Sequence, residues 1–218
     1  MVDADPPVQR FGVSHVASDD GGWVELLAMG LTFDCRGLSP AMAAASPAVG
    51  VRLGLSTAPE GEAIEIVPGP HLAQGGGLIP IVRMQVALGA ALSQLPGAVA
   101  VVWQPARCWM DPTYFRKVSA DWLAGGAFPA LGLTMLESAA NGALVSHGLS
   151  LFTGQELYFE PNHALSPAAT ARIATRLIDA LVQTGPVTQT QEILGPDGQD
   201  ILLVPVRGGE QVRVKIGG

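Results

Sequence analysis

Three residues of this chain are of the types that serve as nucleophile, base and orienting acid in enzymes: Cys108, His147 and Asp111. A cysteine attacks as its thiolate, a histidine can take a proton near neutral pH, and a carboxylate can hold the imidazole in place. Nothing in the sequence brings the three within hydrogen-bonding distance of one another. We therefore keep them as catalytic candidates and expect a protein that is not an enzyme.

The alternative for His147 is structural. Period-two alternation places it on the same strand face as Val145, Leu149 and Leu151, where a satisfied, partly buried histidine is the usual finding. By the same alternation, we expect Glu65, Glu156 and Glu160 to be solvated, because they alternate with apolar neighbours along their strands.

The sequence predicts neither a metal site nor a cofactor. His71 and His163 follow Pro68 and Pro161 in similar loops, so a duplicated structural contact explains them, and neither lies in a His-x-His or His-Glu-x-x-His run. The glycines at 75–77 precede a helix and could offer N–H groups to an anion. Because no Lys-Ser or Lys-Thr pair follows them, we expect a connector.

The composition narrows the possible partners. The net charge is −7, and the chain has two lysines, Lys117 and Lys215, so neither nucleic acid nor an anionic membrane is an expected partner. The start of the chain lacks the basic and apolar regions of a signal peptide, and the apolar stretch 78–95 is interrupted by polar residues and Pro80. We expect a soluble cytoplasmic protein in which Cys35 and Cys108 stay thiols.

An internal repeat guides the fold prediction. The residues at 28–33, 54–56 and 63–68 are echoed in the same order at 130–135, 148–150 and 156–161. This order predicts an α+β protein with internal duplication of a β-β-β-α-β unit, in which mainly antiparallel sheets carry helices on one face.

The expected elements follow from periodicity, caps and turn residues. In the first copy we expect strands at 24–34, 49–56 and 62–67, a helix at 78–95 and an apolar run at 98–103; in the second, strands at 129–137, 142–152 and 156–160, a helix at 167–183 and a strand at 187–194. The expected organisation is one compact domain made of a lead-in at 1–22, a first repeat at 23–106, a linking helix within 107–127, and a second repeat with extra C-terminal strands at 128–218.

One helix suggests a contact with another chain. Arg83, Ala87, Ala90 and Gln94 recur at spacings of four, three and four, which makes a narrow stripe of polar and small residues on an otherwise apolar helix. The stripe predicts a subunit or partner interface, most simply that of a homodimer. The alternative is a helix that its own fold shields on most sides.

The run 146–157, which reads Ser-His-Gly-Leu-Ser-Leu-Phe-Thr-Gly-Gln-Glu-Leu, resembles the signature of a bacterial family catalogued as a domain of unknown function. In that family a Ser/Thr-x-Gly-Leu segment is followed by Phe-Gly-x-x-Glu-Leu, whereas here Thr153 stands between Phe152 and Gly154. The likeness covers residues 95–185 and implies a bacterial origin but brings no catalytic residue. We expect a non-enzymatic protein-interaction or binding module. The alternative is a small-molecule-binding protein or a hydrolase-type enzyme with a pocket between the two repeats.

Overall fold

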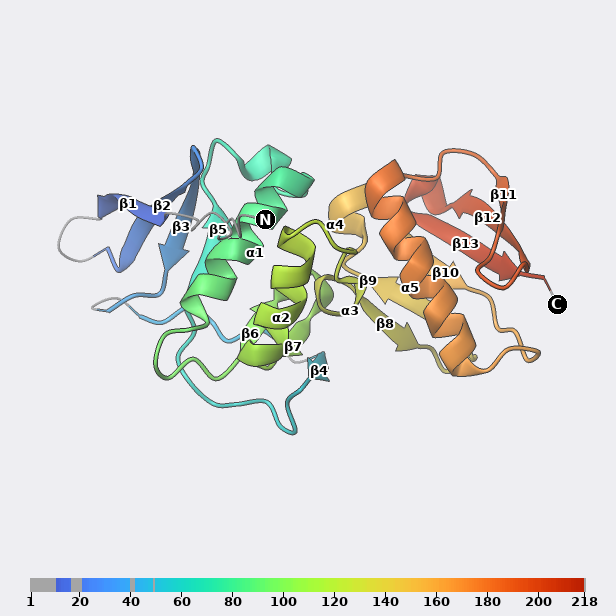
Figure 1. Cartoon of the computed structure of the whole chain (residues 1–218), viewed down its shortest axis with the longest axis horizontal. Coiled ribbons are helices and arrows are strands. Elements are labelled where there is room, and N and C mark those ends of the chain that lie inside the picture. The colour runs from blue at the N-terminus through green and yellow to red at the C-terminus, as the bar shows by residue number, and fades with distance from the viewer. Residues whose placement is uncertain (1–10, 17–20, 40–41, 49, 218) are drawn as a thin grey trace, which may run out of the picture. The chain divides into compact units, whose positions relative to one another are not determined.

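The computed structural model describes residues 11–16, 21–39, 42–48 and 50–217 (Figure 1). The chain forms two compact units: the first takes residues up to Ser46 together with Pro59–Val99, and the second takes Pro47–Ala58 together with residues from Ala100 onward. Helices and three mostly antiparallel sheets make up the described residues, so the protein is α+β, as expected. In the described part of the chain, every helix is too short or too polar to cross a membrane.

The first unit consists of a four-stranded sheet and a helix. The strands are β1 (Phe11–Val16), β2 (Trp23–Ala28), β3 (Leu31–Arg36) and β5 (Glu65–Pro68), in the order β1-β2-β3-β5, with every neighbouring pair antiparallel. A 3-10 turn, η1 (Ala73–Gly75), leads into α1 (Ile79–Leu92), which starts with Pro80 in its first turn. Ile81 and Leu88 of α1 pack against Ala28 and Phe33 of the sheet, so α1 covers one sheet face.

A three-stranded sheet belongs to the second unit. Its strands are β4 (Val51–Leu53), β6 (Val101–Trp103) and β7 (Cys108–Met110), in the order β4-β7-β6, with a 3-10 turn, η2 (Gln104–Ala106), between β6 and β7. β4 runs parallel to β7, whereas β6 runs antiparallel to it. The helix α2 (Pro112–Leu123) follows directly and matches the expected linking helix.

A six-stranded sheet completes the second unit. Its strands are β8 (Met135–Ser138), β9 (Leu144–His147), β10 (Glu156–Phe159), β11 (Gln191–Leu194), β12 (Asp200–Val206) and β13 (Gln211–Ile216). They lie in the order β11-β12-β13-β10-β9-β8, and only the β10/β13 pair is parallel. The connections contain the short helices α3 (Ala130–Leu133) and α4 (Ser150–Thr153) and a 3-10 turn, η3 (Arg207–Gly209).

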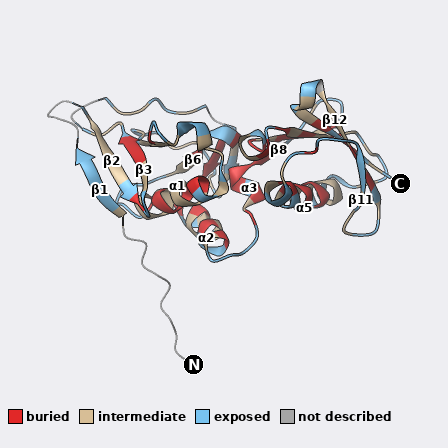
Figure 2. Cartoon of the chain, turned by 90° about the horizontal axis from the view of Figure 1, so that it is seen from above, coloured by how far each residue is buried: buried red, intermediate tan, exposed pale blue. Residues whose placement is uncertain are grey.

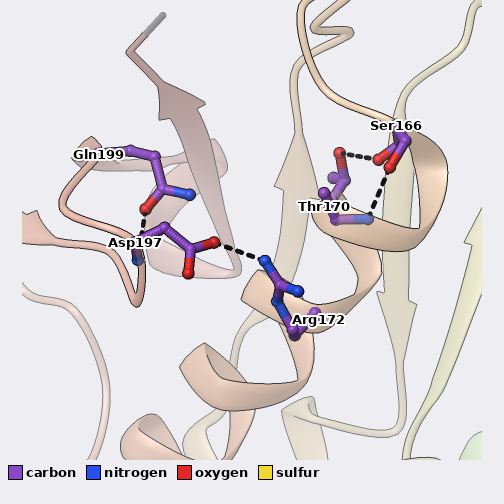
Figure 3. A network of polar contacts seen from close by, with 6 residues as sticks. Ser166, Thr170, Arg172, Asp197 and Gln199 are labelled. Carbon is purple, nitrogen blue, oxygen red and sulfur yellow. Dashed lines mark hydrogen bonds and ion pairs between the residues drawn. The ribbon is translucent and has the colours of Figure 1, made fainter.

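The long helix α5 (Pro167–Thr184) lies across one face of this six-stranded sheet (Figure 1). Its buried residues recur every three or four positions, which is the spacing of one helix face (Figure 2): Ile173, Ala174, Leu177, Ile178 and Leu181. Ser166 caps the start, because its Oγ accepts a hydrogen bond from the N–H of Ala169. Near this end Arg172 Nη2 lies 2.5 Å from Asp197 Oδ2, which ties α5 to the β11–β12 turn (Figure 3).

The structure does not show the expected internal duplication. The echo at 28–33 contains the β2–β3 hairpin turn, where Met29 and Gly30 have φ of 51° and 82°, whereas its counterpart at 130–135 contains α3 and the start of β8. Strand β4, which precedes Gly54, pairs with β7 of the second unit and not with β3 or β5. The echoed segments therefore share apolar and glycine residues that suit several kinds of turn, but not a common strand order.

The expected elements are recovered unevenly. The helices expected at 78–95 and 167–183 are present at 79–92 and 167–184, and a strand occupies 11–16 within the expected lead-in. The strands expected at 49–56, 98–103 and 187–194 are shorter, and the one expected at 129–137 begins as α3. Residues 1–10 of the lead-in lie outside the described residues.

Candidate functional site

His147 ends β9 and is partly buried, with 31% of its side chain exposed. Its Nε2 lies 2.9 Å from Oε2 of Glu137 on the neighbouring strand β8. The same carboxylate oxygen lies 3.9 Å from Nη2 of Arg107. His147 is thus a satisfied histidine paired with a carboxylate, which agrees with the structural alternative.

Cys108 starts β7 and is fully buried. Burial raises the pKa of its thiol to about 11, because the charged thiolate loses its water. At neutral pH the side chain is therefore a protonated thiol. The thiolate is the nucleophilic form, so this environment opposes a catalytic role.

Asp111 caps the start of α2. Its Oδ1 accepts hydrogen bonds from the N–H groups of Thr113 at 2.8 Å and Tyr114 at 3.0 Å. The carboxylate thereby satisfies the helix start and does not orient an imidazole. Each of the three catalytic candidates thus has a local environment of its own, and no described hydrogen bond or ion pair joins any two of them.

The stripe on α1 is not a continuous surface. Ala87 is only 4% exposed, Arg83 and Ala90 are partly buried, and Gln94 is exposed. A partner could not reach Ala87 without opening the fold. This burial matches the alternative in which the protein's own fold shields most of the helix.

The other candidates from the sequence lie in turns. His71 Nε2 is 3.3 Å from Oγ1 of Thr32, and His163 is exposed in the turn before α5. The glycines at 75–77 lie in η1 and the turn that leads into α1. Among the described residues, no group of three or more His, Cys, Asp and Glu side chains is placed to hold a metal ion.

Glu156 at the start of β10 is not a solvated strand position, contrary to the sequence-based interpretation. Its Oε1 accepts hydrogen bonds from the N–H groups of Gly148 at 2.8 Å and Ser150 at 3.0 Å, and its Oε2 accepts one from Ser146 Oγ at 2.5 Å. Ser146 Oγ in turn accepts from the N–H of Leu157. In the run Ser-x-Gly-Leu-Ser followed by Glu-Leu, the Glu156 carboxylate therefore binds the backbone of the turn that precedes it.

Gln155 is a second polar residue that the sequence did not single out. It is only 6% exposed, and its Nε2 donates to the carbonyl oxygens of Val187 at 3.0 Å and Gly209 at 2.7 Å. Its Oε1 accepts from the N–H of Val187 at 2.8 Å. One buried amide, directly before β10, thus joins this part of the chain to two segments that follow far along it.

The remaining candidate is the outer strand of the first sheet. β1 lies at one end of the strand order, and five of its six residues are exposed (Figures 1 and 2). Val13 and Val16 are 58% and 63% exposed, although both are apolar. We call strand β1, with the backbone groups that β2 does not pair, the β1 edge. An exposed strand edge with apolar side chains is a template for another strand.

Comparisons of the chain with protein-family models, with curated proteins and with solved structures find no match.

Proposed function

We propose that this is a soluble, cytoplasmic bacterial protein that acts as a non-enzymatic protein-interaction module, with the β1 edge as its binding element. The observation that carries the proposal is the exposure of β1 at the end of its sheet, with Val13 and Val16 open to solvent. A strand edge binds an extended segment through backbone hydrogen bonds, while side-chain contacts add selectivity.

Charge supports a protein partner. β1 reads Phe-Gly-Val-Ser-His-Val, without Asp, Glu, Lys or Arg, so an uncharged extended segment can approach it. The net charge of −7 disfavours a phosphate backbone.

The environments of Cys108 and Asp111 weaken the enzymatic alternative. The Cys108 thiol has a raised pKa and is enclosed, and the Asp111 carboxylate caps a helix. What favours the alternative is the pair His147–Glu137, since a carboxylate can orient an imidazole that acts as a base.

A capture experiment with matched variants tests the proposal. Immobilised wild type, Val13→Lys and Leu194→Lys would be incubated with extract of the native host, and bound proteins quantified by mass spectrometry. Leu194 is an exposed apolar residue on β11, one of the two outer strands of the six-stranded sheet, so Leu194→Lys adds the same charge at a different edge. We expect a defined set of proteins that wild type and Leu194→Lys retain and Val13→Lys loses.

Two results would count against the proposal. An identical set of captured proteins for all three would remove the β1 edge as the binding element. Hydrolysis of activated esters by the wild type, lost in His147→Gln, would instead support the enzymatic alternative.

A further inference from the structure

We propose that the β1 edge pairs antiparallel with the β1 edge of a second copy of this chain, across a twofold axis at Gly12. This inference rests on the proposed function, because it names the partner of the same edge. This dimer contact is not the one that the stripe on α1 predicts. Ala87 of that stripe is buried, whereas β1 is exposed.

The direction of the free backbone groups follows from the register of the sheet. The N–H of Gly69 donates to the carbonyl of Thr32, so Thr32 of β3 directs its backbone groups toward the β5 side. Backbone groups alternate sides along an antiparallel strand. Phe33 therefore faces β2, and Leu27 of β2 faces β1, where its partner is Gly12.

The residues of β1 next to Gly12 must then direct their backbone groups outward. These residues are Phe11 and Val13, which lie opposite Ala28 and Leu26. Their N–H and C=O groups are the ones that β2 leaves unpaired, and the described residues supply no other strand beside them. The β1 edge thus offers two donors and two acceptors in a row.

The opposite edge of the same sheet is closed. By the same alternation Pro68 and Ile66 of β5 face outward, but Pro68 has no N–H, and the carbonyl of Ile66 accepts a hydrogen bond from Gln85 Nε2 at 2.8 Å. A proline and an occupied carbonyl are poor partners for a further strand. Strand addition to this sheet is therefore directed to β1.

A second copy fits this edge because the edge is complementary to itself. With the axis at Gly12, Phe11 of each copy lies opposite Val13 of the other, and each such pair exchanges its two backbone hydrogen bonds. β1 contains no Asp, Glu, Lys or Arg, so two copies bring no like-charged side chains together. Val13, 58% exposed in a single chain, would gain an apolar neighbour on the same sheet face.

Gly12 suits the position on the axis. Residues that lie opposite each other without exchanging hydrogen bonds have their Cα atoms close together, about 4.5 Å apart. A Cβ built on Gly12 meets nothing within 4 Å, so the sheet face over this residue is open in the single chain. Leu27, the neighbour of Gly12 on β2, is 41% exposed, and the two Leu27 side chains would flank the glycine pair.

Sedimentation velocity from low to high micromolar concentration tests the pairing. We expect a wild-type dimer that dissociates on dilution. Val13→Pro removes an outward N–H that the chain's own sheet does not use, so the fold should survive while two intersubunit hydrogen bonds, one per copy, are lost. The dimer dissociation constant should rise at least about tenfold. Leu194→Lys should dimerise like the wild type.

Disulfide trapping tests the register directly. Gly12→Cys, in a background with Cys35→Ser and Cys108→Ser, should form an intermolecular disulfide under mild oxidation, whereas Leu194→Cys in that background should not. Circular dichroism would establish that each variant is folded.

A wild-type protein that stays monomeric at high micromolar concentration overturns the pairing, as does a dimer that Val13→Pro leaves unchanged. If such a monomer still captures other proteins through the β1 edge, the proposed function stands and only self-pairing fails. If the edge captures nothing either, both fail.

Discussion

The sheet of the first unit and the six-stranded sheet of the second satisfy their polar groups in different ways. Beside the six-stranded sheet, the side chains of Gln155 and Glu156 form hydrogen bonds with backbone groups of the segments that connect its strands. The first sheet is closed at β5 but leaves the outward backbone groups of β1 unpaired among the described residues. Removal of a polar side chain should therefore lower the folding stability of the second unit. In the first unit, a change at the β1 edge should weaken association instead.

The largest expected effect on stability concerns Gln155. Gln155→Ala leaves the buried N–H and C=O of Val187 and the partly buried C=O of Gly209 without their partner. We expect the free energy of unfolding to fall by about 3 kcal/mol, since a buried group that loses its partner costs about 1 kcal/mol or more. Urea unfolding followed by circular dichroism measures this.

The matched variant in the first unit is Ser14→Ala. Ser14 on β1 donates a hydrogen bond to Glu25 Oε1 in an exposed position. Its removal should change the free energy of unfolding by no more than about 0.5 kcal/mol. Equal costs for Ser14→Ala and Gln155→Ala would contradict the contrast between the two sheets.

A smaller effect is expected at Gly148, which the Glu156 carboxylate holds in place. Its φ is +87°, and a Cβ there would lie 3.0 to 3.1 Å from three atoms of Ala106, two of them backbone. Gly148→Ala combines backbone strain with a close contact, and we expect a loss of about 2 to 3 kcal/mol in unfolding free energy.

Alanine variants of two other glycines test the backbone strain without the close contact. Gly154 in the second unit and Gly30 in the β2–β3 turn have φ of +74° and +82°, and a Cβ on either meets nothing within 4 Å. Their alanine variants should lose only about 1 kcal/mol each, the cost of a left-handed conformation. If Gly148→Ala costs no more than these two, the packing against Ala106 is not a constraint.

Local signals in the sequence predict where two of the helices start. Asp111-Pro112 and Ser166-Pro167 each combine a capping side chain with a first-turn proline, and α2 and α5 begin where these pairs predict. The partner of a strand is not a local property. Val51–Leu53 reads as a strand, but its pairing with β7, more than fifty residues later in the chain, decides which unit it joins.

The candidate catalytic residues also show that local sequence does not determine which distant residues come together. Cys108, His147 and Asp111 are of residue types that serve in catalysis, but the structure gives each a separate environment. The sequence alone does not indicate the role of Gln155, because its partners, Val187 and Gly209, lie 32 and 54 positions away. The strand at 11–16 lies within the expected lead-in, and its place at a sheet edge depends on the order of all four strands.

A pH-dependent effect is expected at the two buried cysteines, one in each unit. Burial raises the pKa of the Cys35 thiol, and it raises that of Cys108 from 9.0 to about 11. Between pH 9 and 11 the unfolded chain releases the Cys108 proton while the folded chain keeps it. This group therefore leaves stability unchanged below pH 9 and lowers it as the pH rises toward 11.

At pH 10 the loss due to Cys108 should be on the order of 1 kcal/mol, because one unit of pKa difference corresponds to about 1.4 kcal/mol. Urea unfolding of wild type, Cys108→Ala and Cys35→Ala at pH 8 and pH 10 measures it. The drop in unfolding free energy between the two pH values, rather than the stability itself, is the quantity to compare, since each alanine also leaves a small cavity. Cys108→Ala should show a smaller drop than wild type, whereas an equal drop would mean that the Cys108 thiol ionises in the folded protein as readily as in the unfolded chain.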